Sequence, residues 1–212
     1  MVTLAGDDGT VTSRRQEGFE QFLKGELSYH DKHTGQTYQT DRIWTQAEID
    51  ALCSDYRAVC SWSADGAYDY LKMAFADMIT DAKNRNGRLF IYSMDDEMTL
   101  GVLSLLEEDV LSSETKAELA ELDVCISAIG GMQELYDIMD GSAAQTSVAD
   151  RYFDDMMSVY FSPKMMIDVI GYMEDYLNGD WTYAPGSEKY EPVWIVDQDN
   201  VSQYEGFEGH AD

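Results

Sequence analysis

Three carboxylates follow one of the most apolar short segments of the chain and could bind a divalent metal ion. Asp95, Asp96 and Glu97 come after Leu89–Tyr92, and carboxylates at the end of a strand are ligands that Mg²⁺ accepts. The same residues also fit the first turn of a helix, where anions are favoured and Ser93 with Asp96 forms a capping pair. Because no basic or phosphate-binding motif accompanies them, we favour the capping interpretation.

Four further side chains are compatible with zinc in type but not in spacing. They are His30, His33, Cys53 and Cys60, and their pairs lack the short separations of zinc knuckles. The cysteines are seven residues apart, which on a helix is two turns, or about 10 Å, and too far for two ligands of one ion. We therefore interpret the cysteines as buried apolar residues and the histidines as surface residues.

A segment near the C-terminus imitates part of a calcium-binding loop. Asp197, Asp199 and Glu208 occupy the first, third and twelfth positions of such a loop. Val201 brings no side-chain oxygen to the fifth position, and Ser202 replaces the glycine that the turn requires. These departures argue against a calcium site.

The remaining residue types do not support nucleophilic catalysis. The histidines are His30, His33 and His210, two near a predicted turn and one in the tail, so we do not expect a well-positioned imidazole base. The chain contains no nucleophile elbow, phosphate loop or dinucleotide fingerprint. We therefore expect no catalytic residues, no cofactor and no metal, and a hydrolase that uses only carboxylates stays open as the enzyme alternative.

The elements that would position these residues are predicted to be mainly helices. Amphipathic spacing, a capping box at Thr45–Glu48, a capping Ser63 and glycine stops indicate where they begin and end. The predicted helices cover residues 14–27, 45–59, 63–86, 93–106, 113–128, 131–140, 147–160 and 163–177. The predicted strands are a hairpin over 28–38 and the segments 88–92 and 192–196. We predict an α+β fold that is predominantly helical with a small antiparallel sheet.

The last predicted helix has the clearest boundaries. Ser162-Pro163 places a capping hydroxyl before a proline at the first helical position, and Asn178-Gly179 ends the helix. The spacing of its apolar residues predicts a buried face that consists of Met166, Ile167, Ile170, Met173 and Leu177.

Composition indicates a folded protein. Hydrophobic residues make up 44% and aromatic residues 12% of the 212 residues, whereas disordered acidic chains are poor in aromatic residues. The N-terminus has no basic segment followed by an apolar one, and no apolar run approaches the roughly 20 residues that span a bilayer. The three cysteines fit a reducing compartment. We expect a cytoplasmic protein that does not bind membranes.

The acidic residues are distributed unevenly along the chain. Residues 1–92 contain 14 Asp and Glu against 10 Lys and Arg, whereas residues 93–212 contain 27 against 4. This contrast predicts a near-neutral mixed region over 1–92 and an acidic, mainly helical region over 93–212, within one continuous domain or as two. Repulsion among so many like charges opposes compactness, so we expect the acidic region to have a function.

That function is predicted to be the binding of a basic partner. Carboxylates on the predicted helices recur at helical spacing and would form an acidic partner-binding surface. The candidate residues of this surface are Glu107, Glu108, Asp109, Glu114, Glu118, Glu121, Asp137, Asp140, Asp150, Asp154, Asp155, Glu174 and Asp175.

In charge and helical character, residues 93–212 are similar to the DNA-mimicking antirestriction and anti-CRISPR inhibitors of phages and mobile elements. The resemblance implies an inhibitor that occupies the nucleic-acid groove of a basic enzyme without binding nucleic acid itself, while residues 1–92 provide specificity or a homodimer contact. Two alternatives stay open. One is a structural or assembly protein such as a virion component, and the other is the carboxylate-based hydrolase.

Overall fold

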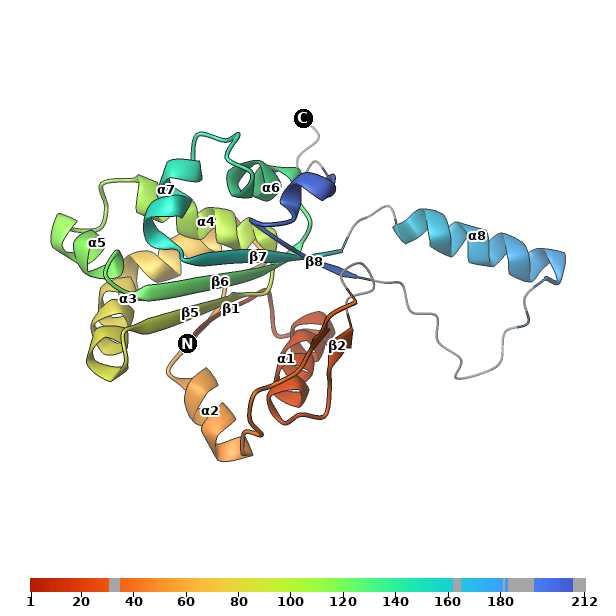
Figure 1. Ribbon diagram of the computed structural model, residues 1–212, viewed down its shortest axis with the longest axis horizontal. Coiled ribbons are helices and arrows are strands. Elements are labelled where there is room, and N and C mark those ends of the chain that lie inside the picture. The colour runs from red at the N-terminus through yellow and green to blue at the C-terminus, as the bar shows by residue number, and fades with distance from the viewer. Residues whose placement is uncertain (31–34, 162–164, 181, 183–192, 208–212) are drawn as a thin grey trace.

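Apolar runs separated by helices build a parallel sheet in the computed structural model, which describes residues 1–30, 35–161, 165–180, 182 and 193–207 (Figure 1). Among these residues the main sheet has six strands, in the order β4-β1-β5-β6-β7-β8. The strands from β4 to β7 in this order are parallel, and β8 runs antiparallel to β7. The predicted small antiparallel sheet is therefore wrong, and the fold is α/β.

The sheet takes strands from both halves of the chain. Its strands are β1 (Val2–Ala5), β4 (Tyr56–Val59), β5 (Arg88–Ser93), β6 (Asp123–Gly130), β7 (Asp155–Tyr160) and β8 (Trp194–Asp197). A separate antiparallel hairpin pairs β2 (Tyr29–His30) with β3 (Thr37–Tyr38), as the sequence predicts. This hairpin does not join the main sheet, contrary to our expectation.

Eight α-helices and one 3₁₀ helix occur among the described residues. They are α1 (Thr10–Leu23), α2 (Gln46–Ser54), α3 (Ala64–Arg85), α4 (Asp96–Glu107), α5 (Ser113–Leu119), α6 (Gln133–Met139), α7 (Thr146–Tyr152), α8 (Met165–Asn178) and the 3₁₀ helix η1 (Val201–Gln203). None of the helices in the described part of the chain combines the length and apolar character needed to cross a membrane.

Of the four strands that the sequence did not reveal, three (β1, β6 and β7) lie inside the sheet between two other strands. A parallel strand is buried on both faces, so it reads as a short apolar run instead of an alternating pattern, and such a run cannot be told from a buried helix by periodicity. The predicted helices 113–128 and 147–160 contain β6 and β7 for this reason. β4 lies within the predicted helix 45–59 but is an edge strand in which Arg57 and Val59 are exposed. No element was predicted where β1 lies.

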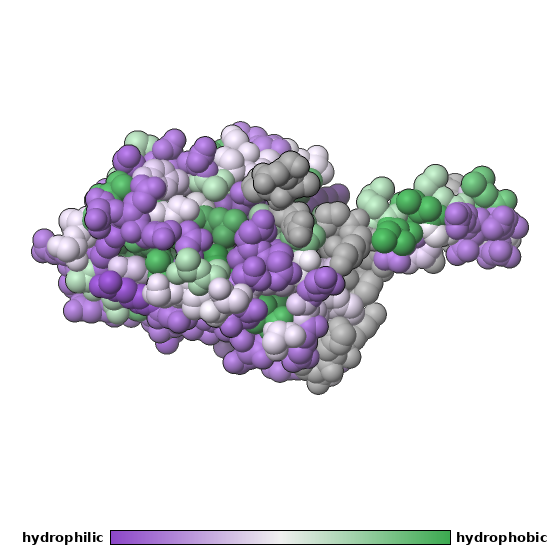
Figure 2. All heavy atoms as spheres, turned by 90° about the horizontal axis from the view of Figure 1, so that it is seen from above, coloured by the Kyte–Doolittle hydropathy of each residue, from purple (hydrophilic) through white to green (hydrophobic). Residues whose placement is uncertain are grey.

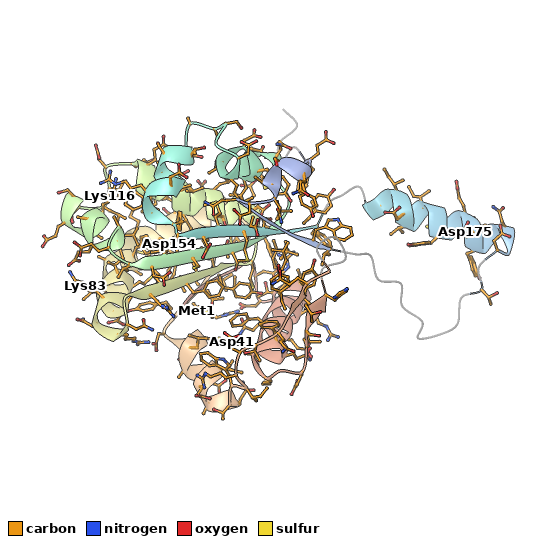
Figure 3. The ribbon with its side chains drawn as sticks, in the orientation of Figure 1. Met1, Asp41, Lys83, Lys116, Asp154 and Asp175 are labelled. Carbon is orange, nitrogen blue, oxygen red and sulfur yellow. The ribbon has the colours of Figure 1, made fainter. Side chains whose placement is uncertain are left out.

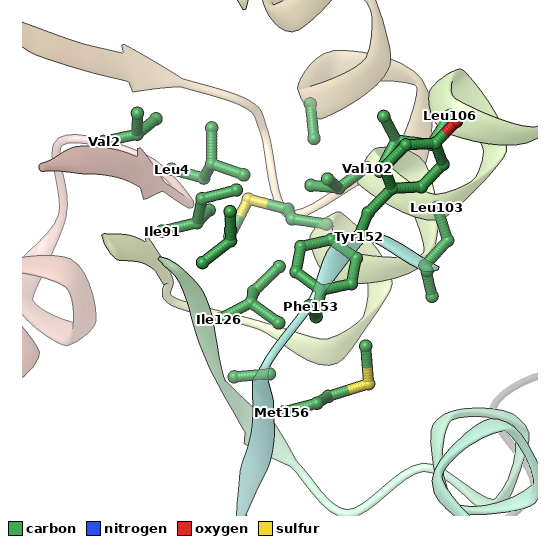
Figure 4. Packing of buried hydrophobic residues seen from close by; sticks show 14 of the residues in the cluster. Val2, Leu4, Ile91, Val102, Leu103, Leu106, Ile126, Tyr152, Phe153 and Met156 are labelled. Carbon is green, nitrogen blue, oxygen red and sulfur yellow. The ribbon is translucent and has the colours of Figure 1, made fainter. Parts of the chain in front are cut away.

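Helices lie on both faces of the sheet (Figure 1). On one face lie α3 to α7, and Figure 4 shows how α4 side chains such as Val102 and Leu106 pack toward strand residues such as Leu4 and Ile126. On the other face, Phe19 of α1 stacks on Tyr92 of β5 with ring centroids 5.0 Å apart. The face under α3 to α7 is the more completely covered, because Val124 and Ile126 of β6 are buried there, whereas Cys125 and Ser127 on the other face are only partly buried.

Local capping signals fix several helix boundaries. Thr45 and Glu48 form the predicted capping box at α2, and the Ser63 hydroxyl accepts the Gly66 amide at α3. The predicted cap of α4 by Ser93 is wrong. Its N-cap is Asp95, whose carboxylate accepts the Glu97 amide at 3.1 Å, because β5 continues through Ser93 and the helix begins later.

Helix α8 stands apart from the rest of the domain (Figure 1). Figure 2 shows apolar side chains gathered on its surface. The predicted buried face is wrong, because its side chains are 54–78% exposed; these residues are Met166, Ile167, Ile170, Met173 and Leu177. Helical spacing determines which residues share a face, but only tertiary packing determines whether that face is covered. The predicted cap at Ser162-Pro163 lies outside the described residues.

The contrast between α3 and α8 gives a stability prediction. Replacing Phe75 of α3, which is fully buried, by alanine is expected to lower the free energy of unfolding by about 3–5 kcal/mol, because it leaves a cavity in the core. Replacing Met173 of α8, which is 59% exposed, is expected to change it by less than about 0.5 kcal/mol. Urea unfolding followed by circular dichroism measures both, and equal losses would contradict this account of the core.

Candidate ligand site at the carboxyl edge of the sheet

The loops after β1 and β5 leave the sheet in opposite directions. The strand order places β1 between β4 and β5. The chain passes from β1 to α1 on one face of the sheet and from β5 to α4 on the other (Figure 1). In α/β proteins, ligands bind outside the carboxyl ends of the strands at such a switch point.

Arg15 of α1 connects the two loops. Its guanidinium donates a hydrogen bond to the backbone carbonyl of Met94 and lies 3.9 Å from the Asp95 carboxylate. The guanidinium carbon is also 5.1 Å from the centre of the Trp62 ring. Burial lowers the pKa of Arg15, and Asp95 opposes that shift. A half-buried cation therefore joins α1, the end of β5 and the loop after β4.

Trp62 is held against the loop after β1 by unusual backbone geometry. Ser61 and Trp62 have φ angles of 55° and 56°, in the left-handed region that residues other than glycine seldom adopt. A Cβ atom on Gly6 would lie 1.9 Å from Cε2 of the indole, so the ring packs directly on the glycine backbone. Strained residues of this kind tend to occur at functional sites.

Asp7 supplies an exposed carboxylate beside this ring. Its carboxylate accepts the Gly9 amide at 2.7 Å and the Thr12 hydroxyl at 3.2 Å. The bond from Gly9, followed by a side-chain bond from Trp62, lowers the pKa of Asp7. Asp7 is therefore ionised near neutral pH and acts as a hydrogen-bond acceptor.

The other carboxylate at this edge, Asp95, is directly followed by a fully buried one. The Asp96 carboxylate accepts the amides of Gly131 at 2.6 Å and Met132 at 2.8 Å, and the Ser158 hydroxyl at 2.7 Å. Burial raises the pKa of Asp96 to about 6, although these three hydrogen bonds act in the opposite direction. Asp96 thereby ties the start of α4 to the turn before α6 and to β7.

These contacts bear on the metal-binding hypotheses. Asp96 and Glu97 lie in the first turn of α4, as the capping interpretation predicts, and both oxygens of Asp96 accept hydrogen bonds. Cys60 is buried and His30 is exposed, as predicted, whereas the prediction that Cys53 is buried is wrong because Cys53 is only partly buried. Among the described residues, no three His, Cys, Asp or Glu side chains are grouped to hold a metal ion. His33, Glu208 and His210 lie outside the described residues.

The carboxylates that we predicted to bind a partner lie elsewhere. They are distributed over six elements of the structure. The positions are the end of α4 (Glu107, Glu108 and Asp109), α5 and the residues just after it (Glu114, Glu118 and Glu121), α6 and the residue just after it (Asp137 and Asp140), α7 (Asp150), the start of β7 (Asp154 and Asp155) and α8 (Glu174 and Asp175). Figure 3 shows how far Asp154 lies from Asp175. The structure does not bring all of these carboxylates onto one face, and none of them joins Asp7 and Asp95.

Some of the predicted residues line cavities at the other end of α4. Glu107 and Asp109 share a cavity of about 480 Å³ with Lys116 and Arg151. Glu118 is paired with Lys83 of α3 at 2.7 Å, so part of the acidic charge is neutralised within the domain. That these residues bind a partner stays a prediction.

Sequence reasoning missed Asp7, Arg15 and Trp62. The signal that could have found the first of them is Gly6-Asp7-Asp8-Gly9, a loop directly after the apolar run Val2–Ala5. Recognising that run as a parallel strand would have placed the loop at a ligand-binding edge. Arg15 and Trp62 reach the same edge only through the tertiary fold.

Comparison with known proteins supports the fold assignment. The chain matches no family model and no curated protein. It is similar to the crystal structure of a galactofuranose binding protein, with a TM-score of 0.53 and 15% identity over 95% of this chain and 53% of that one. The chain thus spans about half the length of that protein.

A weaker similarity involves the periplasmic binding protein component of the arabinose ABC transporter from Shewanella sp. ANA-3. The TM-score is 0.47, and the identity is 14% over 74% of this chain and 46% of the other.

The fold and the first match correct the functional prediction. The matched protein is named for binding the sugar galactofuranose. The prediction of an antirestriction or anti-CRISPR decoy with a basic, nucleic-acid-binding partner is therefore wrong. It failed because charge composition reports on the surface of a protein and carries no information about how its chain folds.

The contact between Gly6 and Trp62 gives a prediction. Gly6→Ala is expected to displace the indole and lower the free energy of unfolding by about 1–3 kcal/mol, because a methyl group cannot fit between the ring and the backbone. Gly18→Ala is the matched control. A Cβ on Gly18 of α1 meets nothing within 4 Å, so the change is expected to stabilise the helix by about 0.5–1 kcal/mol. Thermal unfolding and tryptophan fluorescence test both, and a neutral Gly6→Ala would contradict the described packing.

The raised pKa of Asp96 predicts a pH dependence of stability. The folded state holds the proton up to about pH 6, whereas the ordinary pKa is 3.8. The folded state binds this proton more tightly than the unfolded state does, and the resulting stabilisation is complete below pH 3.8 and is lost as the pH rises through 6. Relative to Asp96→Asn, the wild type is expected to lose up to about 3 kcal/mol of unfolding free energy over this range.

Urea unfolding at several pH values between 4 and 7 measures this difference. A constant difference between wild type and Asp96→Asn across the range would show that Asp96 does not titrate in the folded state as described.

Proposed function

We propose that this chain is a carbohydrate-binding domain that holds a neutral sugar non-covalently at the carboxyl edge of the sheet. One observation carries the proposal. Trp62, Arg15 and two carboxylates, Asp7 and Asp95, are joined into one cluster where the loops after β1 and β5 diverge. This position is where an α/β sheet binds ligands.

The chemistry of the cluster suits a polyhydroxylated ring. The carbon-bound hydrogens on one face of a sugar can pack on the Trp62 indole. Its hydroxyl groups can donate to the carboxylates of Asp7 and Asp95 and accept from the guanidinium of Arg15. The ionised state of Asp7, which results from its hydrogen bonds, suits it for accepting hydrogen bonds rather than for donating a proton in catalysis.

The charge of the site favours neutral sugars over acidic ones. Two carboxylates accompany one guanidinium in the cluster, and the chain as a whole has a net charge of −27. An anionic ligand would be repelled both locally and at long range. The similarity to a galactofuranose binding protein supports the same class of ligand. We extend the proposal of sugar binding to any larger protein that contains this domain.

Isothermal titration with methyl β-galactofuranoside, D-galactose and D-galacturonate tests the proposal. Binding of at least one neutral sugar and no binding of galacturonate are expected. Trp62→Ala is expected to weaken binding about tenfold or more, the equivalent of about 1.4 kcal/mol, because it removes the surface on which the sugar packs.

Trp44→Ala is the matched control for this variant. Trp44 also has a guanidinium over its ring, that of Arg42 at 3.8 Å, but it lies near the C-terminal end of α1, where its amide bonds the Leu23 carbonyl. This variant is expected to bind as the wild type does. If both tryptophan variants bind equally well, or if galacturonate binds best, the proposed site is wrong.

A further inference from the structure

The junction between β5 and α4 directs two adjacent carboxylates to different places. Asp95 is half-buried and lies 3.9 Å from Arg15 at the ligand edge. Asp96 is fully buried and accepts three hydrogen bonds from Gly131, Met132 and Ser158. Because the two residues are neighbours in the chain, the position of Asp96 determines where the backbone of Asp95 lies.

The turn that Asp96 holds is a meeting point of several segments. The Phe161 amide, at the end of β7, donates to the Gly130 carbonyl at 2.8 Å, and the Phe207 amide donates to the Gly131 carbonyl at 2.9 Å. A Cβ on Gly130 would lie 2.7 Å from the Asp96 carboxylate, so the approach is close. The Asp96 carboxylate therefore holds together the turn that follows β6 and the strand β7 at the carboxyl edge of the sheet.

Three titratable or charged groups on the surrounding elements interact electrostatically with Asp96. Asp95 on the same helix end repels it, and Arg15 of α1 is attracted by it. Burial and, to a smaller extent, the charge of Asp96 raise the pKa of the Tyr136 phenol of α6. From β7 the facing group is the neutral hydroxyl of Ser158. Arg15 and Asp95 are thus the groups of the ligand site on which the charge of Asp96 acts.

We propose that Asp96 is a positioning residue for the sugar site and that its ionisation increases affinity by holding Arg15 and the β5–α4 junction in place. This inference rests on the proposed function. The ionised carboxylate accepts all three hydrogen bonds with charge assistance and attracts Arg15. The protonated group must donate one of its hydrogen bonds, forms weaker neutral bonds and attracts Arg15 less.

The test compares sugar affinity at pH 5 and pH 7.5. Wild type is expected to bind the neutral sugar about fivefold or more tightly at the higher pH, a typical size for coupling between two sites. Asp96→Asn preserves the shape of the side chain without the charge, and it is expected to bind at both pH values with the affinity that the wild type has at pH 5.

Ser158→Ala is a second variant that retains the charge. It removes one hydrogen bond that favours the ionised form, so the pH dependence is expected to persist with its midpoint at a higher pH. This variant keeps the proposal open to refutation if Asp96→Asn fails to fold. Equal wild-type affinity at both pH values, an Asp96→Asn profile like that of wild type, or an unshifted midpoint in Ser158→Ala would overturn the proposal.

A measurement without sugar separates this inference from the proposed function. The side-chain NMR signal of Arg15 is expected to shift between pH 5 and pH 7.5 in the wild type but not in Asp96→Asn. If no sugar binds and Arg15 still responds in this way, the proposed ligand is wrong while the positioning role stands. If Arg15 does not respond, the positioning role is refuted whether or not a sugar binds.

Discussion

Neighbouring parallel strands can be joined only by connections that pass over a face of the sheet, and the rest of this structure depends on that constraint. Each parallel connection must cross over through a helix, and the strand order sends the chain after β1 and the chain after β5 to opposite faces. The two loops therefore diverge at one edge. The ligand site that we propose exists because of this divergence and requires no special motif in the sequence.

Arg15 turns this topological feature into a defined cluster. One guanidinium contacts the Met94 carbonyl, approaches Asp95 and lies over Trp62, so it joins three connections that are distant in the chain. Its charge is balanced within the cluster, which reduces the cost of burying it. Asp96, the next residue after Asp95, is buried beneath this cluster. An asparagine at this position would have the same shape and would avoid the free-energy cost of burying a charge, yet the domain has a carboxylate there.

The acidic excess of residues 93–212 has a different structural meaning from the one that composition indicates. Its carboxylates are distributed among α4, α5, α6, α7, β7 and α8, as expected for the solvated surfaces of elements that alternate along an α/β chain. Some serve local structure: Asp154 accepts the Val124 amide at 2.8 Å, and Glu118 pairs with Lys83. A count of charges cannot distinguish such roles from a binding surface.

The amino-acid sequence by itself determined the features that depend on neighbours in the chain. The capping box at Thr45, the cap at Ser63, the hairpin and the apolar strand β5 follow from local hydrogen bonding and local hydrophobic patterns. Only the tertiary structure decided whether the other apolar runs form strands, because β1 is stabilised by pairing with β4 and β5, whose residues lie more than fifty positions away. It also decided that the apolar face of α8 is exposed and that Asp7, Arg15 and Trp62 meet, since both outcomes depend on how distant segments pack.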